Sequence, residues 1–174
     1  MIIVVMGVAG AGKTLIGEQL ARSLAVKFFD ADDFHSPEAV AKMASGTPLT
    51  DADRGPWLDR IASRISETDS HGESAVFACS TLKESYREKL RSAAAAGHVK
   101  FVFLRVTPEL ASSRLKKRRG HYMPPGLVAS QFSALEEPSN VLALDGSRRA
   151  DDLVREILKR LPAKESADDH THQR

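Results

Sequence analysis

Five short apolar runs, separated by amphipathic segments, constrain the fold of this chain most strongly. The runs cover residues 2–6, 26–29, 75–79, 99–106 and 141–144. Their length and their content of Val, Ile and Phe are typical of strands buried on both faces. The segments between them repeat apolar residues at helical spacing; the clearest faces contain Leu15, Ile16, Leu20 and Leu24, then Leu58, Ile61 and Ile65, and finally Leu153, Val154, Ile157, Leu158 and Leu161. This alternation predicts an α/β fold in which helices cover both faces of a parallel sheet.

The length of 174 residues suits one domain with a substantial core. We predict that this domain covers residues 1–162. Residues 163–174 are polar and follow Pro162, so we predict a disordered tail. Two connections, 30–74 and 114–126, are longer than usual, and in such folds long excursions at the carboxyl ends of strands bind substrates.

Composition excludes several classes of protein. A net charge of +2, from 25 basic and 23 acidic residues, is too small to indicate binding to nucleic acid or to an anionic membrane. The single cysteine, Cys79, cannot form an internal disulfide and fits a reducing compartment. The apolar residues 2–6 lack the basic stretch and long apolar region of a signal peptide, and no run reaches the ~18 residues of a membrane helix. We therefore expect a cytoplasmic protein.

A glycine-rich loop lies between the first apolar run and the first helical segment. It matches Gly-x-x-x-x-Gly-Lys-Ser/Thr without a mismatch, and its residues are Gly7, Val8, Ala9, Gly10, Ala11, Gly12, Lys13 and Thr14. The glycines let backbone N–H groups turn toward an anion, Lys13 reaches the β- and γ-phosphates, and Thr14 offers a hydroxyl to Mg²⁺. The loop predicts a nucleoside triphosphate site.

The phosphate acceptor is harder to identify from the residues. The guanine-reading motif Asn-Lys-x-Asp is absent, and the third apolar run ends in Cys79-Ser80, where many P-loop ATPases carry an acidic residue. Carboxylates follow the second run instead. Asp30 and Asp32, two apart on an expected extended segment, would project to one side, one toward metal-bound water and the other toward an acceptor hydroxyl. The alternative is helix capping, since Asp33 or Ser36 could cap the segment that begins at Pro37. We favour capping for Ser36 and a reactive role over capping for Asp32.

Four stretches of the chain together resemble the gluconokinases, small P-loop kinases related to shikimate kinase and the nucleoside-monophosphate kinases. They are the glycine-rich loop, residues 30–58, residues 79–91 and residues 114–138, and the block GTPLTDADRGPWL is the most specific. The resemblance covers about residues 2–161. It implies phosphorylation of D-gluconate at its terminal hydroxyl by ATP and Mg²⁺, a strand order of 2-3-1-4-5, a substrate-binding insertion over about 33–72, a lid over about 114–126, and a homodimer.

Cationic residues are candidates for binding an anionic polyol. Arg54 follows Asp51 and Asp53 at an expected helix start, where pairing with these acids is the structural alternative. Lys83 is expected in the first turn of a helix, where a cation is unfavourable unless an anion lies nearby. We expect both residues to bind substrate. Trp57, the only tryptophan, is expected to pack in the core.

The basic run 114–121 is assigned to the lid by the resemblance. Basic segments over a triphosphate neutralise charge and exclude water during transfer. We expect Arg118 to contact the phosphates and Arg114 to contact the base or the phosphates. His121 is a candidate for contact with the acceptor, the alternative being no contact at all. Lys116 and Lys117 are expected to be solvated.

The sequence therefore predicts a kinase in which Lys13, Asp32 and Arg118 are catalytic and Thr14 and Asp30 serve the metal. Asp32 would orient or deprotonate the terminal hydroxyl of the sugar acid. Two alternatives remain: a related kinase that acts on shikimate or a nucleoside monophosphate, and a nucleotide-binding switch without catalytic activity.

Overall fold

The computed structural model of this chain describes residues 1–117 and 125–161. Five strands pair in parallel in the order β2-β3-β1-β4-β5, which confirms the predicted α/β fold and strand order. The strands are β1 (Ile2–Met6), β2 (Lys27–Asp30), β3 (Ala75–Ala78), β4 (Val99–Arg105) and β5 (Leu142–Asp145). Each lies inside or within one residue of an apolar run.

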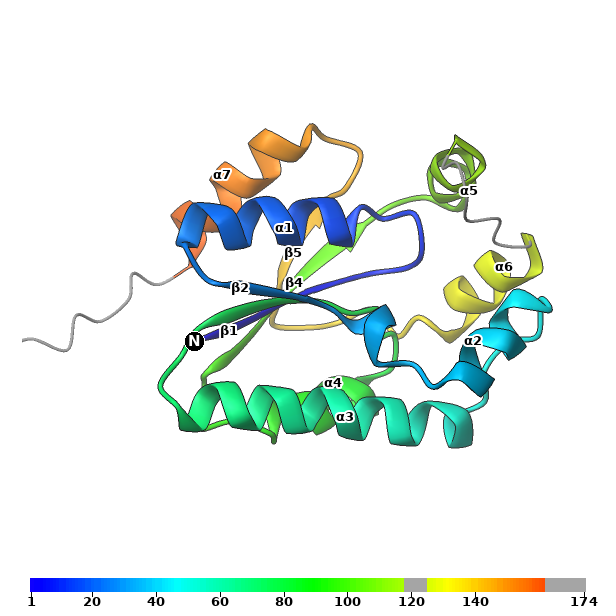
Figure 1. Cartoon of the computed structure of the whole chain (residues 1–174). Helices are drawn as coiled ribbons and strands as arrows, with labels where there is room; N and C mark the ends of the chain where they lie inside the picture. Colours follow the sequence, from blue (N-terminus) through cyan, green and yellow to red (C-terminus); the bar gives the residue numbers. More distant parts are fainter. Residues whose placement is uncertain (118–124, 162–174) are drawn as a thin grey trace, which may run out of the picture.

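Helices cover both faces of the sheet (Figure 1). Helices α1 (Lys13–Leu24) and α7 (Ala150–Arg160) pack on one face, and α3 (Asp51–Ser70) and α4 (Glu84–Arg91) pack on the other. The described part of the chain also contains the 3₁₀ turn η1 (Ala31–Phe34) and the helices α2 (Pro37–Ala44), α5 (Pro108–Lys117) and α6 (Pro125–Ala134). Within the described residues, no helix is both long and apolar enough to cross a bilayer.

Burial follows the position of each strand in the sheet. All residues of β1 and β3 are buried, because β1 and β3 are flanked by other strands and covered by helices on both faces. The edge strands β2 and β5 each keep exposed positions. The expectation of burial on both faces therefore holds for these two central strands and is wrong for the edges.

Helix α1 corrects one predicted core position. Ile16 and Leu20 are buried against the sheet, but Leu15 is 52% exposed. Successive helical residues are rotated by about 100°, so Leu15 lies beside the buried stripe rather than within it. Gly17 lets α1 approach β2 closely, because a Cβ there would lie 2.6 Å from the Phe28 ring and the ring would have to shift.

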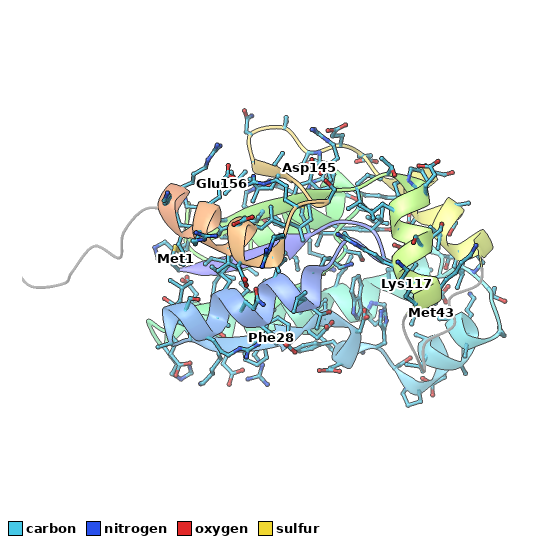
Figure 2. All side chains as sticks on the ribbon, turned by 90° about the horizontal axis from the view of Figure 1, so that it is seen from above. Met1, Phe28, Met43, Lys117, Asp145 and Glu156 are labelled. Atoms are coloured by element: carbon cyan, nitrogen blue, oxygen red, sulfur yellow. The ribbon has the colours of Figure 1, made fainter. Side chains whose placement is uncertain are left out.

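The carboxyl ends of the parallel strands meet at one end of the molecule. Helices α2, α5 and α6 gather there, next to the start of α1 (Figure 1). Seen from above, Met43 in α2 and Lys117 in α5 lie at this end and Met1 lies at the other (Figure 2). In open parallel sheets this end is where ligands bind.

Candidate active site

The loop between β1 and α1 has a backbone that calls for glycine at two positions of the motif. Gly10 and Gly12 have φ angles of 81° and 100°, which side-chain-bearing residues rarely adopt. A Cβ on Gly10 would also lie 2.6 Å from the Ala111 carbonyl oxygen in α5. Backbone conformation therefore favours glycine at both positions of the motif, and close packing against α5 also excludes a side chain at Gly10.

Lys13 and Thr14 begin α1 directly after this loop. The Lys13 ammonium folds back and donates a 3.0 Å hydrogen bond to the Val8 carbonyl oxygen. The Thr14 hydroxyl donates a 2.8 Å hydrogen bond to Asp30 at the end of β2. The Lys13 ammonium and the hydroxyl–carboxylate pair of Thr14 and Asp30 therefore lie at the carboxyl end of the sheet.

The structure corrects the conformation expected around Asp32. Asp30 ends β2, and the chain then enters η1 instead of continuing as an extended segment. Asp30 caps this turn, because its carboxylate accepts the Asp32 N–H at 3.0 Å. The Asp32 side chain is exposed and accepts no hydrogen bond from any described residue. Ser36 is confirmed as the cap of α2, since its hydroxyl accepts the Ala39 N–H at 3.2 Å.

Trp57 fixes the turn that carries these carboxylates. It is 3% exposed, as expected for a core residue, and its indole N–H donates a 2.7 Å hydrogen bond to the Ala31 carbonyl oxygen. The His35 ring stacks on the indole with centroids 4.7 Å apart. Burial lowers the pKa of His35, and the charges of Arg60 and Arg54 lower it further against the opposing effect of Asp32.

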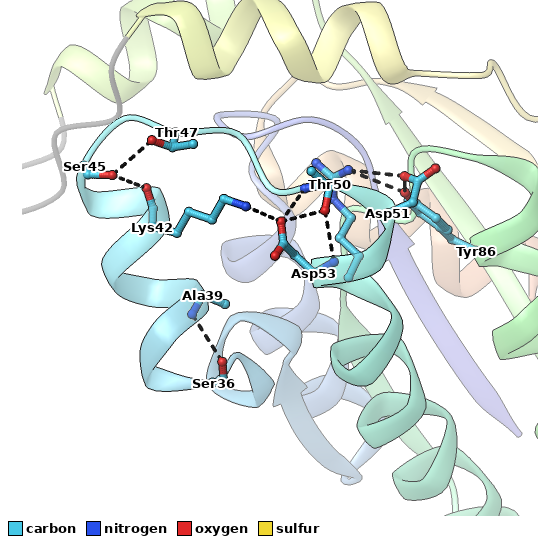
Figure 3. A network of polar contacts seen from close by, with 10 residues as sticks. Ser36, Ala39, Lys42, Ser45, Thr47, Thr50, Asp51, Asp53 and Tyr86 are labelled. Atoms are coloured by element: carbon cyan, nitrogen blue, oxygen red, sulfur yellow. Dashed lines mark hydrogen bonds and ion pairs between the residues drawn. The ribbon is translucent and has the colours of Figure 1, made fainter.

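The Asp51 carboxylate contacts both of the cations that are predicted to bind substrate. Lys83 donates to its carboxylate at 2.7 Å, and the Arg54 guanidinium lies 3.6 Å from it. The Tyr86 hydroxyl also donates to this carboxylate (Figure 3). Hydrogen bonds from Lys83 and Tyr86 lower the pKa of Asp51, and the bond to Asp51 raises the pKa of Lys83. Lys83 is the N-cap of α4 and so lies just before the first turn in which it is predicted. The Asp51 carboxylate is the nearby anion that offsets the unfavourable placement of a cation at this helix start.

Asp53 ties α2 to the start of α3. Its carboxylate accepts from the Lys42 ammonium at 2.6 Å and from the Thr50 N–H at 2.7 Å (Figure 3). The Lys42 ammonium and the Thr50 donors hold the pKa of Asp53 well below its usual range. Thr50 and Asp53 form a capping box, so the acids of the DADR segment have the structural role considered from the sequence.

Arg114 lies against the glycine-rich loop. Its guanidinium donates to the carbonyl oxygens of Ala11 at 3.2 Å and of Gly146 at 2.8 Å. These contacts join α5 to the loop and to the turn after β5. Contact of Arg114 with a nucleotide stays a prediction. Arg118 and His121, and the predicted tail over 163–174, lie outside the described residues.

Comparison with known proteins identifies the family. A family model described as an AAA domain matches residues 2–138. A probable gluconokinase of Xenopus tropicalis is 40% identical over 173 residues, covering 90% of this chain and 91% of that protein. A gluconokinase of Gluconobacter oxydans is 39% identical over 166 residues, covering 94% and 92%. The chain belongs to the gluconokinase family. The crystal structure of a gluconokinase from Sinorhizobium meliloti, 41% identical, superposes with a TM-score of 0.82 over 90% of this chain and 89% of that one.

Two contacts near the glycine-rich loop and α4 do not follow from the sequence. Gln131 in α6 accepts the Ala9 N–H of the loop at 2.7 Å, and Lys83 pairs with Asp51, whereas the Arg54–Asp51 pair is the structural alternative already considered. No local pattern marks Gln131. Arg87 in α4 is 1% exposed and donates to the carbonyl oxygens of Thr81 and Leu82, so it supports the loop before α4.

Proposed function

We propose that this chain transfers the γ-phosphoryl group of ATP to the terminal hydroxyl of D-gluconate and forms 6-phosphogluconate. One observation carries the proposal: three neighbouring strands end at complementary groups. The phosphate-binding loop follows β1, the carboxylates Asp30 and Asp32 lie at the end of β2 and just after it, and Lys83 follows β3. Membership of the gluconokinase family supports the choice of acceptor.

In this proposal the loop amides and Lys13 hold the triphosphate. Thr14 and Asp30 would hold Mg²⁺, which neutralises phosphate charge when bound. Their hydroxyl and carboxylate oxygens are of the kind that Mg²⁺ prefers, and Mg²⁺ in kinases commonly uses few protein ligands together with phosphate oxygens and water. The chemistry of the donor pair therefore fits the metal.

Asp32 is the general base for the acceptor. Its carboxylate is exposed at the site and is not engaged as a cap, so it is available to accept the proton of the attacking hydroxyl. Arg54 and Lys83 bind the anionic end of the sugar acid. Because phosphoryl transfer needs little covalent help from the protein, positioning and charge stabilisation by these side chains account for the rate.

The test is a coupled assay of ADP formation by the purified full chain with gluconate, shikimate, glycerate and AMP as separate acceptors. Lys13→Met serves as the control, because it removes the ammonium at the phosphates without touching the core. We expect gluconate to give the highest kcat/KM and the control to lose most turnover with an unchanged circular dichroism spectrum. Preference for another acceptor would contradict the proposal.

A further inference from the structure

Gln131 connects two segments that are distant in sequence. Its side-chain oxygen Oε1 accepts the backbone N–H of Ala9 at 2.7 Å, across 122 positions of the chain. Ala9 lies inside the glycine-rich loop, whose N–H groups are the donors that phosphate oxygens require. A neutral side-chain acceptor therefore takes up one of these donors.

The place of this contact within the loop is informative. The Ala9 N–H belongs to the same peptide unit as the Val8 carbonyl, which accepts the Lys13 ammonium at 3.0 Å. The lysine of this motif reaches the β- and γ-phosphates. The Val8–Ala9 peptide unit thus contacts both Gln131 and Lys13, the residue whose ammonium is expected to bind the terminal phosphate.

The NH₂ group of the Gln131 side chain, unlike its oxygen, donates no hydrogen bond to the described residues. A glutamine side chain carries one acceptor oxygen and an NH₂ group with two donors. Among residues 1–117 and 125–161, no group accepts a hydrogen bond from the Gln131 NH₂, although the side chain is partly buried. The contact with Ala9 fixes the amide, so this donor group is held next to the loop.

Helix α6 is held firmly enough to position that donor. Leu127 and Val128 are buried. Just after the helix, the Glu136 N–H donates to the Leu82 carbonyl oxygen at 2.9 Å, and the Glu136 carboxylate accepts the Glu84 N–H at 2.6 Å. Gln131 therefore belongs to a segment that is also anchored to the loop carrying Lys83.

We propose that Gln131 is a nucleotide-positioning residue that distinguishes ATP from ADP. Its Oε1 holds the Ala9 peptide, and its NH₂ donates to an oxygen of the terminal phosphate of ATP, which ADP lacks. The inference rests on the proposed function in taking ATP as the nucleotide.

The test compares the binding of a non-hydrolysable ATP analogue and of ADP, each with Mg²⁺ and without acceptor, by calorimetry. Gln131→Glu keeps an acceptor for Ala9 but replaces the donor with a negative charge. We expect the affinity for the ATP analogue to fall about tenfold or more and that for ADP to change by no more than about twofold. Ser133→Glu, an exposed position on the same helix, adds the same charge away from the loop and should leave the ratio of the two affinities unchanged.

Equal weakening of both nucleotides by Gln131→Glu, or no weakening, would overturn the inference. If that variant does not fold, Gln131→Leu decides: it should weaken the ATP analogue several-fold more than ADP, and an equal loss refutes the role. Failure of the wild-type protein to bind either nucleotide would overturn both proposals. Normal nucleotide discrimination without phosphorylation of gluconate would overturn the proposed function alone.

Discussion

The indole N–H of Trp57 in α3 donates a 2.7 Å hydrogen bond to the carbonyl oxygen of Ala31 in η1. This bond links the segment GTPLTDADRGPWL, which contains Trp57, to the turn between Asp30 and Asp32. Ala31 is 1% exposed, so its carbonyl group is shielded from water. The tryptophan therefore fixes the backbone that presents the proposed general base.

Trp57→Phe keeps an aromatic ring in the core but removes the donor to Ala31. A buried carbonyl left without its partner costs about 1–3 kcal/mol, so we expect the free energy of unfolding to fall by that amount. We also expect kcat to fall while the KM for ATP changes little, because the shifted turn carries Asp32 and not the glycine-rich loop. Urea unfolding and steady-state kinetics measure both effects. Unchanged stability and turnover would show that the bond does not position the turn.

Asp32→Asn tests the general base. The change keeps the shape of the side chain but removes its charge and basicity, so turnover should fall ~10²–10⁴-fold while ATP affinity stays nearly constant. Asp30→Asn is the matched variant: it keeps an oxygen to cap η1 and should raise the Mg²⁺ concentration needed for half-maximal rate. Near-normal turnover of Asp32→Asn, with an unchanged melting temperature, would remove Asp32 from the catalytic groups.

Arg54→Ala and Lys83→Ala test the acceptor side. Each change removes one of the two cations that contact the Asp51 carboxylate. Because these cations are proposed to bind the anionic end of the sugar acid, we expect the KM for gluconate to rise at least about tenfold with a small change in the KM for ATP. Lys89→Ala is the control, because Lys89 belongs to the same helix as the Lys83 cap but pairs with Asp59. A variant that raised only the KM for ATP would move its residue to the nucleotide side.

His35 predicts a pH dependence of stability. Because burial lowers its pKa below the usual 6.5, the neutral form is favoured in the folded protein. Its contribution to stability is present in full above about pH 6.5 and is lost as pH falls through the folded-state pKa. The melting temperature should therefore fall between about pH 7.5 and about pH 5.5. His35→Phe keeps a ring against Trp57 and should show a smaller fall; an identical fall would assign the effect to other groups.

Local signals account for what the sequence predicts well. The glycines of the phosphate-binding loop, the Ser36 cap and the apolar runs of the strands each depend on neighbouring residues. The strand order, by contrast, is implied only by the family resemblance. The turn at Asp30 differs from the expectation because that expectation extends the strand through Asp32, whereas Asp is disfavoured in strands and favoured as a cap, the role that Asp30 takes at η1. The Gln131 contact and the Asp51 cluster join segments 122 and 32 positions apart, and no periodicity encodes such pairings.

The central claim is tested most directly by the product. Isotopically labelled gluconate, ATP and Mg²⁺ are incubated with the full chain, and the products are followed by ³¹P and ¹³C NMR spectroscopy. The account predicts stoichiometric ADP and a phosphate ester on the terminal carbon of gluconate, with the Lys13→Met protein giving almost none. ADP formed without a gluconate phosphate, or an ester on a different carbon, would contradict it.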